Sequence, residues 1–214
     1  MERKVLILNG SPRAPKSNSK RYAALFSAYC PLACDTLAIT PRNHAELAAR
    51  LPHYSDLLLV FPLYADALPV GVLDFLQYLE AHPVGERPTV SVLINCGFLE
   101  PSQNEIAVRM VRLFCRRNGY RMGSVLMLGS GEAILDTPFR YVARRKIRQL
   151  ARSIADGTCR ELRGTMPLAK RLFLLASTWY WTSYGRKFGV SKRQMQTLQI
   201  EQSGLPDSET AGMH

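Results

Sequence analysis

Short apolar runs alternate with segments whose apolar residues recur at helical spacing, up to about residue 157. The apolar runs, which predict strands, occupy residues 5–8, 37–39, 57–61, 90–94 and 125–128. The segments with helical spacing occupy residues 22–29, 45–51, 72–79, 106–114 and 139–154. Because five strands and five helices alternate strictly, the pattern predicts an α/β fold, a doubly wound five-stranded parallel sheet with helices on both faces.

The chain continues beyond this alternating region with a different pattern. We expect residues 1–160 to form one ligand-binding domain, residues 161–202 a helical basic extension, and residues 203–214 a disordered tail. In a doubly wound sheet, ligands bind at the carboxyl ends of the strands, where the strand order reverses. We therefore expect the functional residues in the loops after Leu8, Phe61, Ile94 and Leu128.

The loop after the first apolar run is rich in hydroxyl groups. It reads NGSPRAPKSNS over residues 9–19 and leads directly into a helix. Hydroxyls and backbone N–H groups at a helix N-terminus bind anions, and this composition suits a terminal monophosphate. The loop has neither the spacing of a nucleoside triphosphate site nor the dinucleotide fingerprint. The plainer alternative is a strand-to-helix loop in which Ser17 or Asn18 is the N-cap.

This loop carries a resemblance to a known family. Its sequence, with Ser-Asn-Ser after the proline and arginine, resembles the phosphate loop of the NAD(P)H-dependent FMN reductase and flavodoxin-like oxidoreductase superfamily. The resemblance implies that residues 1–160 are a flavodoxin-like FMN-binding domain. It also implies that the FMN phosphate is held by Ser11, Arg13, Ser17, Asn18 and Ser19.

The loop after the third apolar run contains two prolines and an aromatic ring. Prolines stiffen the loop, and the flat ring of Tyr64 suits a planar heterocycle, although on the residues alone Tyr64 is equally well explained as a cap on the sheet. The pattern Pro-Leu-Tyr-x-x-x-Leu-Pro resembles the third loop of the same superfamily, whose backbone borders the flavin ring. The resemblance therefore implies cofactor contacts from Pro62, Leu63, Tyr64, Ala65 and Asp66.

The loop after the fourth apolar run resembles a narrower subgroup, the flavodoxin-family NAD(P)H-dependent oxidoreductases. The matching pattern is Asn-Cys-Gly-Phe-x-Glu, with Leu99 where the subgroup usually has proline. This resemblance implies cofactor contacts from Asn95, Cys96, Gly97 and Phe98. A reactive Cys96 thiol is the alternative interpretation of this loop.

Charge is concentrated late in the sequence. The chain has a net charge of +11, and residues 139–193 alone contain fourteen basic and two acidic residues. A solvated helix face accounts for part of this excess, and since no nucleic-acid-binding module is visible we expect no nucleic-acid partner. The five cysteines form no C-x-x-C pair, which is typical of reduced thiols in a cytoplasmic protein and gives no reason to expect a metal site.

The basic extension contains both tryptophans of the chain, Trp179 and Trp181. Its apolar stretch is shorter than the roughly 20 residues that a membrane-spanning helix needs. Three interpretations stay open. The extension packs on its own domain or on a second subunit, forms part of the substrate pocket or a lid, or makes peripheral contact with an anionic membrane surface.

The resemblance implies an enzyme in which FMN accepts electrons from NAD(P)H and passes them to a small acceptor, such as a quinone, a nitroaromatic or a flavin. Homodimers are the habit of this family. The cofactor carries the chemistry, so we assign no catalytic side chain. Two alternatives are a flavodoxin-type electron carrier, which is usually acidic, and a non-catalytic FMN-binding protein.

Overall fold

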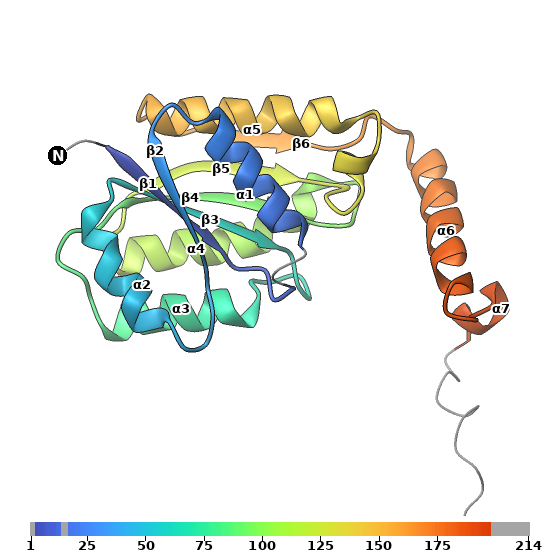
Figure 1. Cartoon of the computed structure of the whole chain (residues 1–214), viewed down its shortest axis with the longest axis horizontal. Helices are drawn as coiled ribbons and strands as arrows, with labels where there is room; N and C mark the ends of the chain where they lie inside the picture. The colour runs from blue at the N-terminus through green and yellow to red at the C-terminus, as the bar shows by residue number, and fades with distance from the viewer. Residues whose placement is uncertain (1–2, 14–16, 198–214) are drawn as a thin grey trace, which may run out of the picture. The chain divides into compact units, whose positions relative to one another are not determined.

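The computed structural model describes residues 3–13 and 17–197 of the chain. The chain divides into two compact units, Met1–Pro167 and Leu168–His214, which we describe separately. The first unit places one sheet between two layers of helices, and the described part of the second contains two helices (Figure 1).

The sheet of the first unit has six parallel strands in the order β2-β1-β3-β4-β5-β6 (Figure 1). The strands are β1 (Lys4–Asn9), β2 (Ala33–Ala38), β3 (Asp56–Pro62), β4 (Thr89–Asn95), β5 (Met122–Leu128) and β6 (Glu161–Gly164). The central strands β3 and β4 are buried along almost their whole length, as their continuous apolar sequences predict. The strand order reverses between β1 and β3, so the chain leaves these two neighbours in opposite directions.

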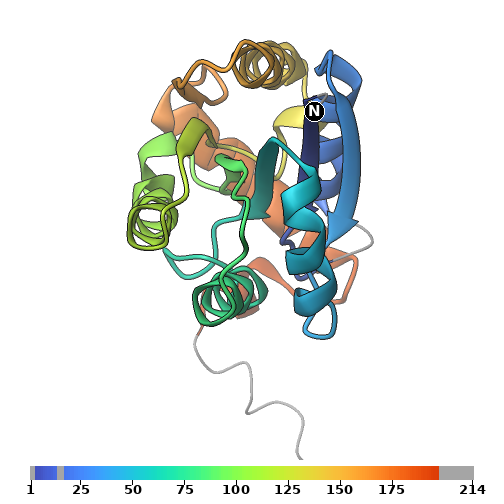
Figure 2. The same cartoon turned by 90° about the vertical axis from the view of Figure 1, so that its left-hand side faces the viewer.

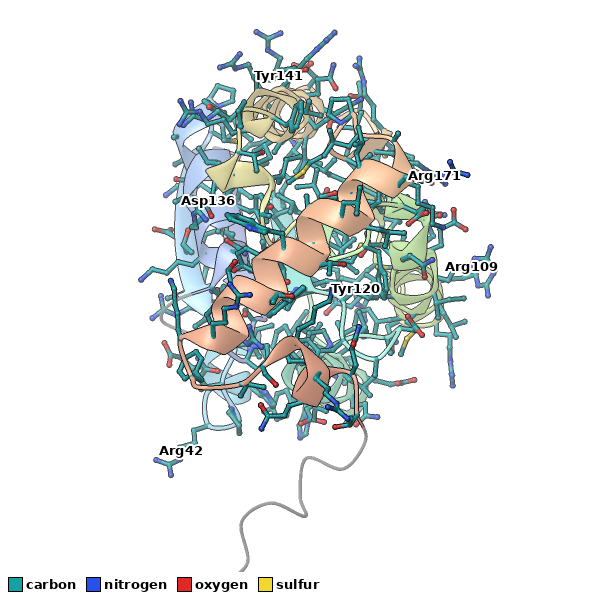
Figure 3. All side chains as sticks on the ribbon, turned by 90° about the vertical axis from the view of Figure 1, so that its right-hand side faces the viewer. Arg42, Arg109, Tyr120, Asp136, Tyr141 and Arg171 are labelled. Atoms are coloured by element: carbon teal, nitrogen blue, oxygen red, sulfur yellow. The ribbon has the colours of Figure 1, made fainter. Side chains whose placement is uncertain are left out.

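Five α-helices of the first unit cover the two faces of the sheet. They are α1 (Asn18–Tyr29), α2 (His44–Arg50), α3 (Val70–Ala81), α4 (Glu105–Arg117) and α5 (Arg140–Ala155). Helices α1 and α5 lie together on one face, and α2, α3 and α4 lie on the other (Figures 1 and 2). Their apolar sides are buried against the strands, while side chains such as Arg109 and Tyr141 project outward, as does Arg42 in the turn before α2 (Figure 3). The predicted α/β class with helices on both faces is confirmed.

The predicted count of five strands is not confirmed, because the sheet has a sixth strand. Strand β6 uses residues that the sequence analysis assigned to the extension, and it pairs with β5 at the edge of the sheet. Leu162 is its only large apolar residue, and its charged neighbours Glu161 and Arg163 are exposed. Charged side chains are typical of edge strands. Because they interrupt the sequence of β6, it contains no continuous apolar run, which is the pattern from which the other strands were predicted.

The second unit contains α6 (Lys170–Arg186) and α7 (Lys192–Met195) in its described part. The chain turns between them at Gly189, whose φ is +73°, and Ser191 and Gln194 form a capping box at the start of α7. The predicted disorder of residues 203–214 concerns residues outside the described ones. Within residues 3–13 and 17–197, every helix is too short or too polar to cross a membrane.

Candidate functional site

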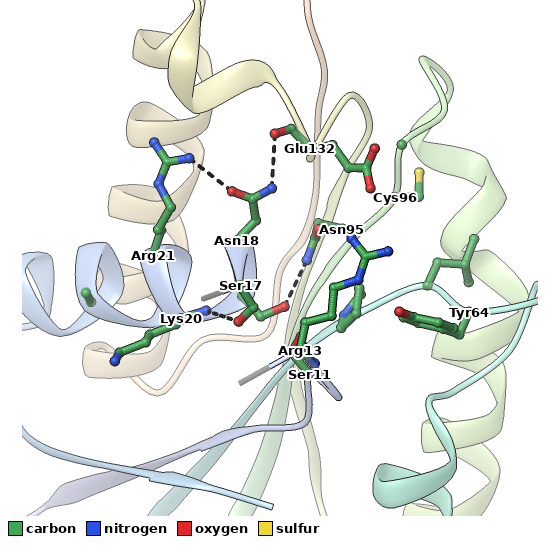
Figure 4. Close-up of a pocket in the computed structure, with 15 residues that line it drawn as sticks. Ser11, Arg13, Ser17, Asn18, Lys20, Arg21, Tyr64, Asn95, Cys96 and Glu132 are labelled. Atoms are coloured by element: carbon green, nitrogen blue, oxygen red, sulfur yellow. Dashed lines mark hydrogen bonds between the residues drawn. The ribbon is translucent and has the colours of Figure 1, made fainter. Parts of the chain in front are cut away.

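A cavity of about 810 Å³ lies in the first unit, at the carboxyl ends of β1, β3 and β4 (Figure 4). This is where the strand order reverses and where ligands bind in doubly wound folds. The predicted residues that line it are Ser11, Arg13, Ser17, Asn18, Ser19, Pro62, Leu63, Tyr64, Asn95, Cys96 and Gly97. Ala65, Asp66 and Phe98 were predicted alongside them but are not part of the lining.

The hydroxyl-rich loop leaves β1 under tight constraints. The Gly10 N–H donates to the Val60 carbonyl oxygen of β3 at 2.9 Å, and the Ser11 N–H donates to Asn9 Oδ1 at 3.0 Å. A Cβ atom on Gly10 would overlap the Val72 side chain at the start of α3. The residue must therefore be glycine for the loop to lie this close to α3.

Helix α1 begins at the cavity. Ser17 is its N-cap and accepts a hydrogen bond from the Lys20 N–H at 3.2 Å. The alternative role that the sequence suggested for Ser17, as a helix N-cap, is therefore confirmed. Three consecutive residues, Ser17, Asn18 and Ser19, nevertheless line the cavity together with Arg13. The first turn of α1 has no acidic residue, and free N–H groups at a helix N-terminus favour an anion there. The arrangement suits a phosphate group.

A buried amide joins three elements beneath the cavity. Asn95, the last residue of β4, donates from Nδ2 to Ser19 Oγ in α1 at 3.3 Å (Figure 4). The same Nδ2 donates to the Phe61 carbonyl oxygen in β3 at 3.2 Å. Both Asn95 and Ser19 are buried. These bonds fix the start of α1 relative to the ends of the two central strands.

The loop after β3 brings an aromatic ring to the cavity. Tyr64 is 41% exposed, and its backbone pairs with that of Ala67. The two residues between them, Ala65 and Asp66, have φ of +44° and +58° and form the tip of a tight turn. The tight turn gives a physical reason why these two residues do not line the cavity although Tyr64 does.

The loop after β4 contributes backbone and a thiol. Burial raises the pKa of Cys96, whose sulfur accepts a hydrogen bond from Asn104 Nδ2 at 3.4 Å. The thiol is therefore protonated at neutral pH, which disfavours the interpretation of Cys96 as a reactive nucleophile. Phe98 lies beyond the lining, and its carbonyl oxygen accepts a hydrogen bond from the Ser130 N–H.

Four lining residues were missed by the sequence analysis: Lys20, Arg21, Ala24 and Glu132. Arg21 donates to both carboxylate oxygens of Asp136, at 2.6 and 2.8 Å, and to Asn18 Oδ1 at 3.0 Å. Asn18 Nδ2 donates in turn to the Glu132 carbonyl oxygen at 3.0 Å (Figure 4). This chain of bonds ties α1 to the loop after β5. Lys20 and Arg21 could have been predicted from helical spacing, because they follow Ser17 by three and four residues and therefore lie on the same face of α1.

The cavity fits FMN in chemistry and size. Its lining offers serine hydroxyls, the Arg13 cation and a helix N-terminus, which suit a phosphate monoester, and also the Tyr64 ring and loop backbone, which suit a flat ring system. Its volume lies within the range of roughly 300–1,000 Å³ that is usual for small-molecule sites.

No family model and no curated protein sequence matches this chain. Among solved structures, it is similar to an NAD(P)H:quinone oxidoreductase from Methanothermobacter marburgensis, at 16% identity and a TM-score of 0.56, over 72% of this chain and 98% of that one. It is also similar to a flavodoxin from Streptococcus pneumoniae TIGR4, at 15% identity and a TM-score of 0.54, over 72% and 99%. An FMN-dependent NADH-azoreductase from Bacillus anthracis in complex with FMN gives 10% identity and a TM-score of 0.53, over 72% and 99%. These similarities show that the chain has a flavodoxin-like fold, which the resemblance implied.

Proposed function

We propose that the protein is an FMN-dependent oxidoreductase that takes electrons from NAD(P)H and passes them to a small acceptor, such as a quinone, a nitroaromatic or a flavin. The observation that carries the proposal is the cavity at the strand-order reversal, whose lining combines Arg13, serine hydroxyls and the α1 N-terminus with the Tyr64 ring. The named activities of the similar structures agree with it.

In this proposal the chain binds and orients the cofactor, and bound FMN supplies the capacity to accept a hydride and release electrons. Ser11, Arg13 and the start of α1 hold the phosphate. The loop backbone at residues 62–64 and 95–97 borders the ring. The half-exposed Tyr64 ring leaves room at the mouth of the cavity for a flat donor or acceptor.

A flavodoxin-type electron carrier is the second candidate, since a flavodoxin is among the similar structures. Charge argues against it. Carriers of this type are usually acidic and dock on basic partners, whereas this chain has a net charge of +11.

Two measurements test the proposal in sequence. Titration of the purified full-length protein with FMN, followed by flavin fluorescence, should show saturable binding, and a protein that never binds FMN contradicts both candidates. Anaerobic stopped-flow mixing of the FMN-loaded protein with NADPH and with NADH should then bleach the flavin absorbance within the turnover time. A loaded protein that neither nucleotide bleaches, but that chemical reductants bleach, favours the carrier.

A further inference from the structure

The long helix of the second unit exposes a row of apolar side chains. In α6, Leu172, Leu175 and Trp179 are each more than half exposed. Because they follow one another by three and four residues, they lie in one stripe along the helix. We call these three residues the apolar stripe. An exposed apolar surface of this kind is typical of a site that binds another surface.

Helix α7 covers a different face of α6. Gly185 of α6 is buried and lies next to Met195 of α7, whose sulfur a Cβ atom on the glycine would overlap. The groove between the two helices is lined from α6 by residues that include Leu174, Thr178 and Trp181, and none of the apolar stripe lines it. The stripe is therefore left uncovered by the second helix of its own unit.

The charges of this segment all have one sign. Residues 168–197 contain six basic residues and no acidic one. These cations lie at the start of α6, at its end and in α7: Lys170, Arg171, Arg186, Lys187, Lys192 and Arg193. Residues 172–185, between the two ends of α6, carry no charge and span about 21 Å of helix. The apolar stripe thus runs between two groups of cations.

This charge pattern favours an anionic surface over a second copy of the chain. A second copy has the same net charge of +11 and the same six cations in this segment. Pairing two copies through the apolar stripe would bring like charges together, which is unfavourable. An anionic surface satisfies the cations and covers the stripe at the same time.

The polar residues of α6 suit a lipid surface. Tyr180, Trp181 and Tyr184 are exposed, and tyrosine and tryptophan are enriched where a bilayer meets water. The hydroxyls of Thr178 and Thr182 donate to carbonyl oxygens one turn earlier in the helix, at 2.8 and 2.7 Å. Because these hydroxyls already have an acceptor within the helix, they cost less to remove from water.

We propose that α6 binds the surface of an anionic lipid bilayer. The helix lies along the surface, with the apolar stripe directed toward the acyl chains and the cations at both ends contacting anionic headgroups. It does not span the bilayer, since no helix within residues 3–13 and 17–197 is long and apolar enough to do so. The surface uses none of the residues that line the flavin cavity, so this proposal does not depend on the proposed reaction.

Flotation of the full-length protein with lipid vesicles tests the proposal. Vesicles of phosphatidylcholine with about 30% phosphatidylserine should carry the protein upward, vesicles of phosphatidylcholine alone should carry much less, and added salt should weaken the binding. A protein that stays at the bottom with both vesicles overturns the proposal. So does a wild-type chain that binds neither vesicle but forms a dimer that substitutions in the stripe dissociate, because a second copy then covers the stripe.

Tryptophan fluorescence identifies the part of the chain that binds. Both tryptophans of the chain, Trp179 and Trp181, lie in α6, so their emission reports on this helix alone. Anionic vesicles should shift the emission to shorter wavelength, and lipids with brominated acyl chains should quench it. Flotation without any change in this emission shows that another surface of the protein binds, and contradicts the proposal.

The first matched pair of variants tests the apolar contact. Leu175→Gln with Trp179→Gln should lower the vesicle partition coefficient at least about tenfold, because two apolar side chains no longer enter the bilayer. Ile106→Gln with Tyr141→Gln removes two exposed apolar side chains of the first unit and should leave binding unchanged. Circular dichroism confirms that each variant is folded. Equal losses in the two variants contradict a role of the stripe.

The second matched pair tests the cations. Arg186→Gln with Lys187→Gln should lower the partition coefficient about tenfold, since each cation near an anionic bilayer contributes about fivefold. Arg144→Gln with Arg145→Gln removes the same charge from α5 of the first unit and should have a much smaller effect. Equal losses would show that only the net charge of the chain matters, and would overturn the assignment of binding to α6.

Discussion

In the first unit the side chains of Phe26, Phe61 and Phe75 are fully buried, whereas in the second Trp179 and Phe188 are 74% and 67% exposed. The first unit closes a core between its sheet and helices. The second, in its described part, has one long and one very short helix, which give too little surface to bury its aromatic residues. The first unit buries its own aromatic side chains. The described part of the second unit leaves its aromatic side chains exposed, and exposed apolar groups of this kind are typical of a surface that binds another one.

Charge sharpens the same comparison. Residues 168–197 contain six basic residues and no acidic one, so the exposed aromatic side chains of the extension lie among cations only. In the first unit, cations such as Arg3, Arg21 and Arg112 are paired with carboxylates. Substitutions matched between the two units therefore test whether the contrast is one of function as well as of packing.

The largest expected effect comes from truncating an aromatic residue in each unit. Phe75→Ala should lower the free energy of unfolding by about 3–5 kcal/mol, because it leaves a cavity in the core. Trp179→Ala should change it by no more than about 0.5 kcal/mol, as for an exposed residue. Urea unfolding followed by circular dichroism measures both. Equal losses would mean that Trp179 is covered in solution, and the contrast would disappear.

The second prediction compares cations. The double change Ser11→Ala and Arg13→Ala should weaken FMN binding about 100-fold and riboflavin binding only slightly, because charge-assisted hydrogen bonds to a phosphate are worth roughly 1.5–3 kcal/mol each. Arg186→Ala, in the extension, should leave both affinities unchanged. Fluorescence titration with the two flavins checks this. An equal loss for riboflavin would contradict the phosphate role, and a loss in Arg186→Ala would place the extension at the site.

The third prediction compares two glycines. Gly10→Ala should cost about 1–3 kcal/mol of unfolding free energy, because the new methyl group overlaps Val72, and Val72→Ala should restore most of the loss. Gly185→Ala meets the Met195 sulfur at 2.7 Å, which is near the end of a flexible side chain, so we expect a change within about 0.5 kcal/mol. Chemical unfolding of the single and double variants gives the coupling, and additive losses would exclude the proposed contact.

The smallest effect concerns the ion pair that ties α1 to the loop after β5. The hydrogen bonds from Arg21 lower the pKa of the Asp136 carboxyl below its ordinary value, so the pair stabilises the folded state while that carboxyl is ionised. The contribution is lost as the pH falls through the lowered pKa. Both side chains are exposed, so the expected size is within about 1 kcal/mol. Between pH 6 and 3, the free energy of unfolding should fall less steeply with decreasing pH in Asp136→Asn than in the wild-type chain. An equal pH dependence in both would show that the ion pair does not contribute to stability.

The parts of the site that are contiguous in sequence could be predicted. Ser11, Arg13 and residues 17–19 follow a strand directly, so their place at the carboxyl edge follows from the fold class alone. Glu132 reaches the cavity through the Asn18 bond to its carbonyl oxygen, which depends on a contact between segments over a hundred residues apart. The place of Glu132 in the loop after Leu128 agrees with the expectation for the carboxyl edge, but no local pattern predicts its hydrogen bond to Asn18.

The unexpected sixth strand has a local cause. Strand β6 has too few apolar residues to form a run, and only its pairing with β5 makes it a strand. The resemblance also implied cofactor contacts from Ala65 and Asp66, which lie at the tip of a turn outside the cavity lining, and the sequence contains no glycine or asparagine there to mark a turn of this type.

That turn has a consequence for laboratory evolution. Ala65 and Asp66 both adopt a left-handed backbone, which costs non-glycine residues about 1–2 kcal/mol each. A library randomised at these two positions and screened for heat tolerance should therefore be enriched in Asn-Gly pairs, which adopt this backbone without strain. Gains found there would come from the backbone, close to the site but without altering any side chain that lines it.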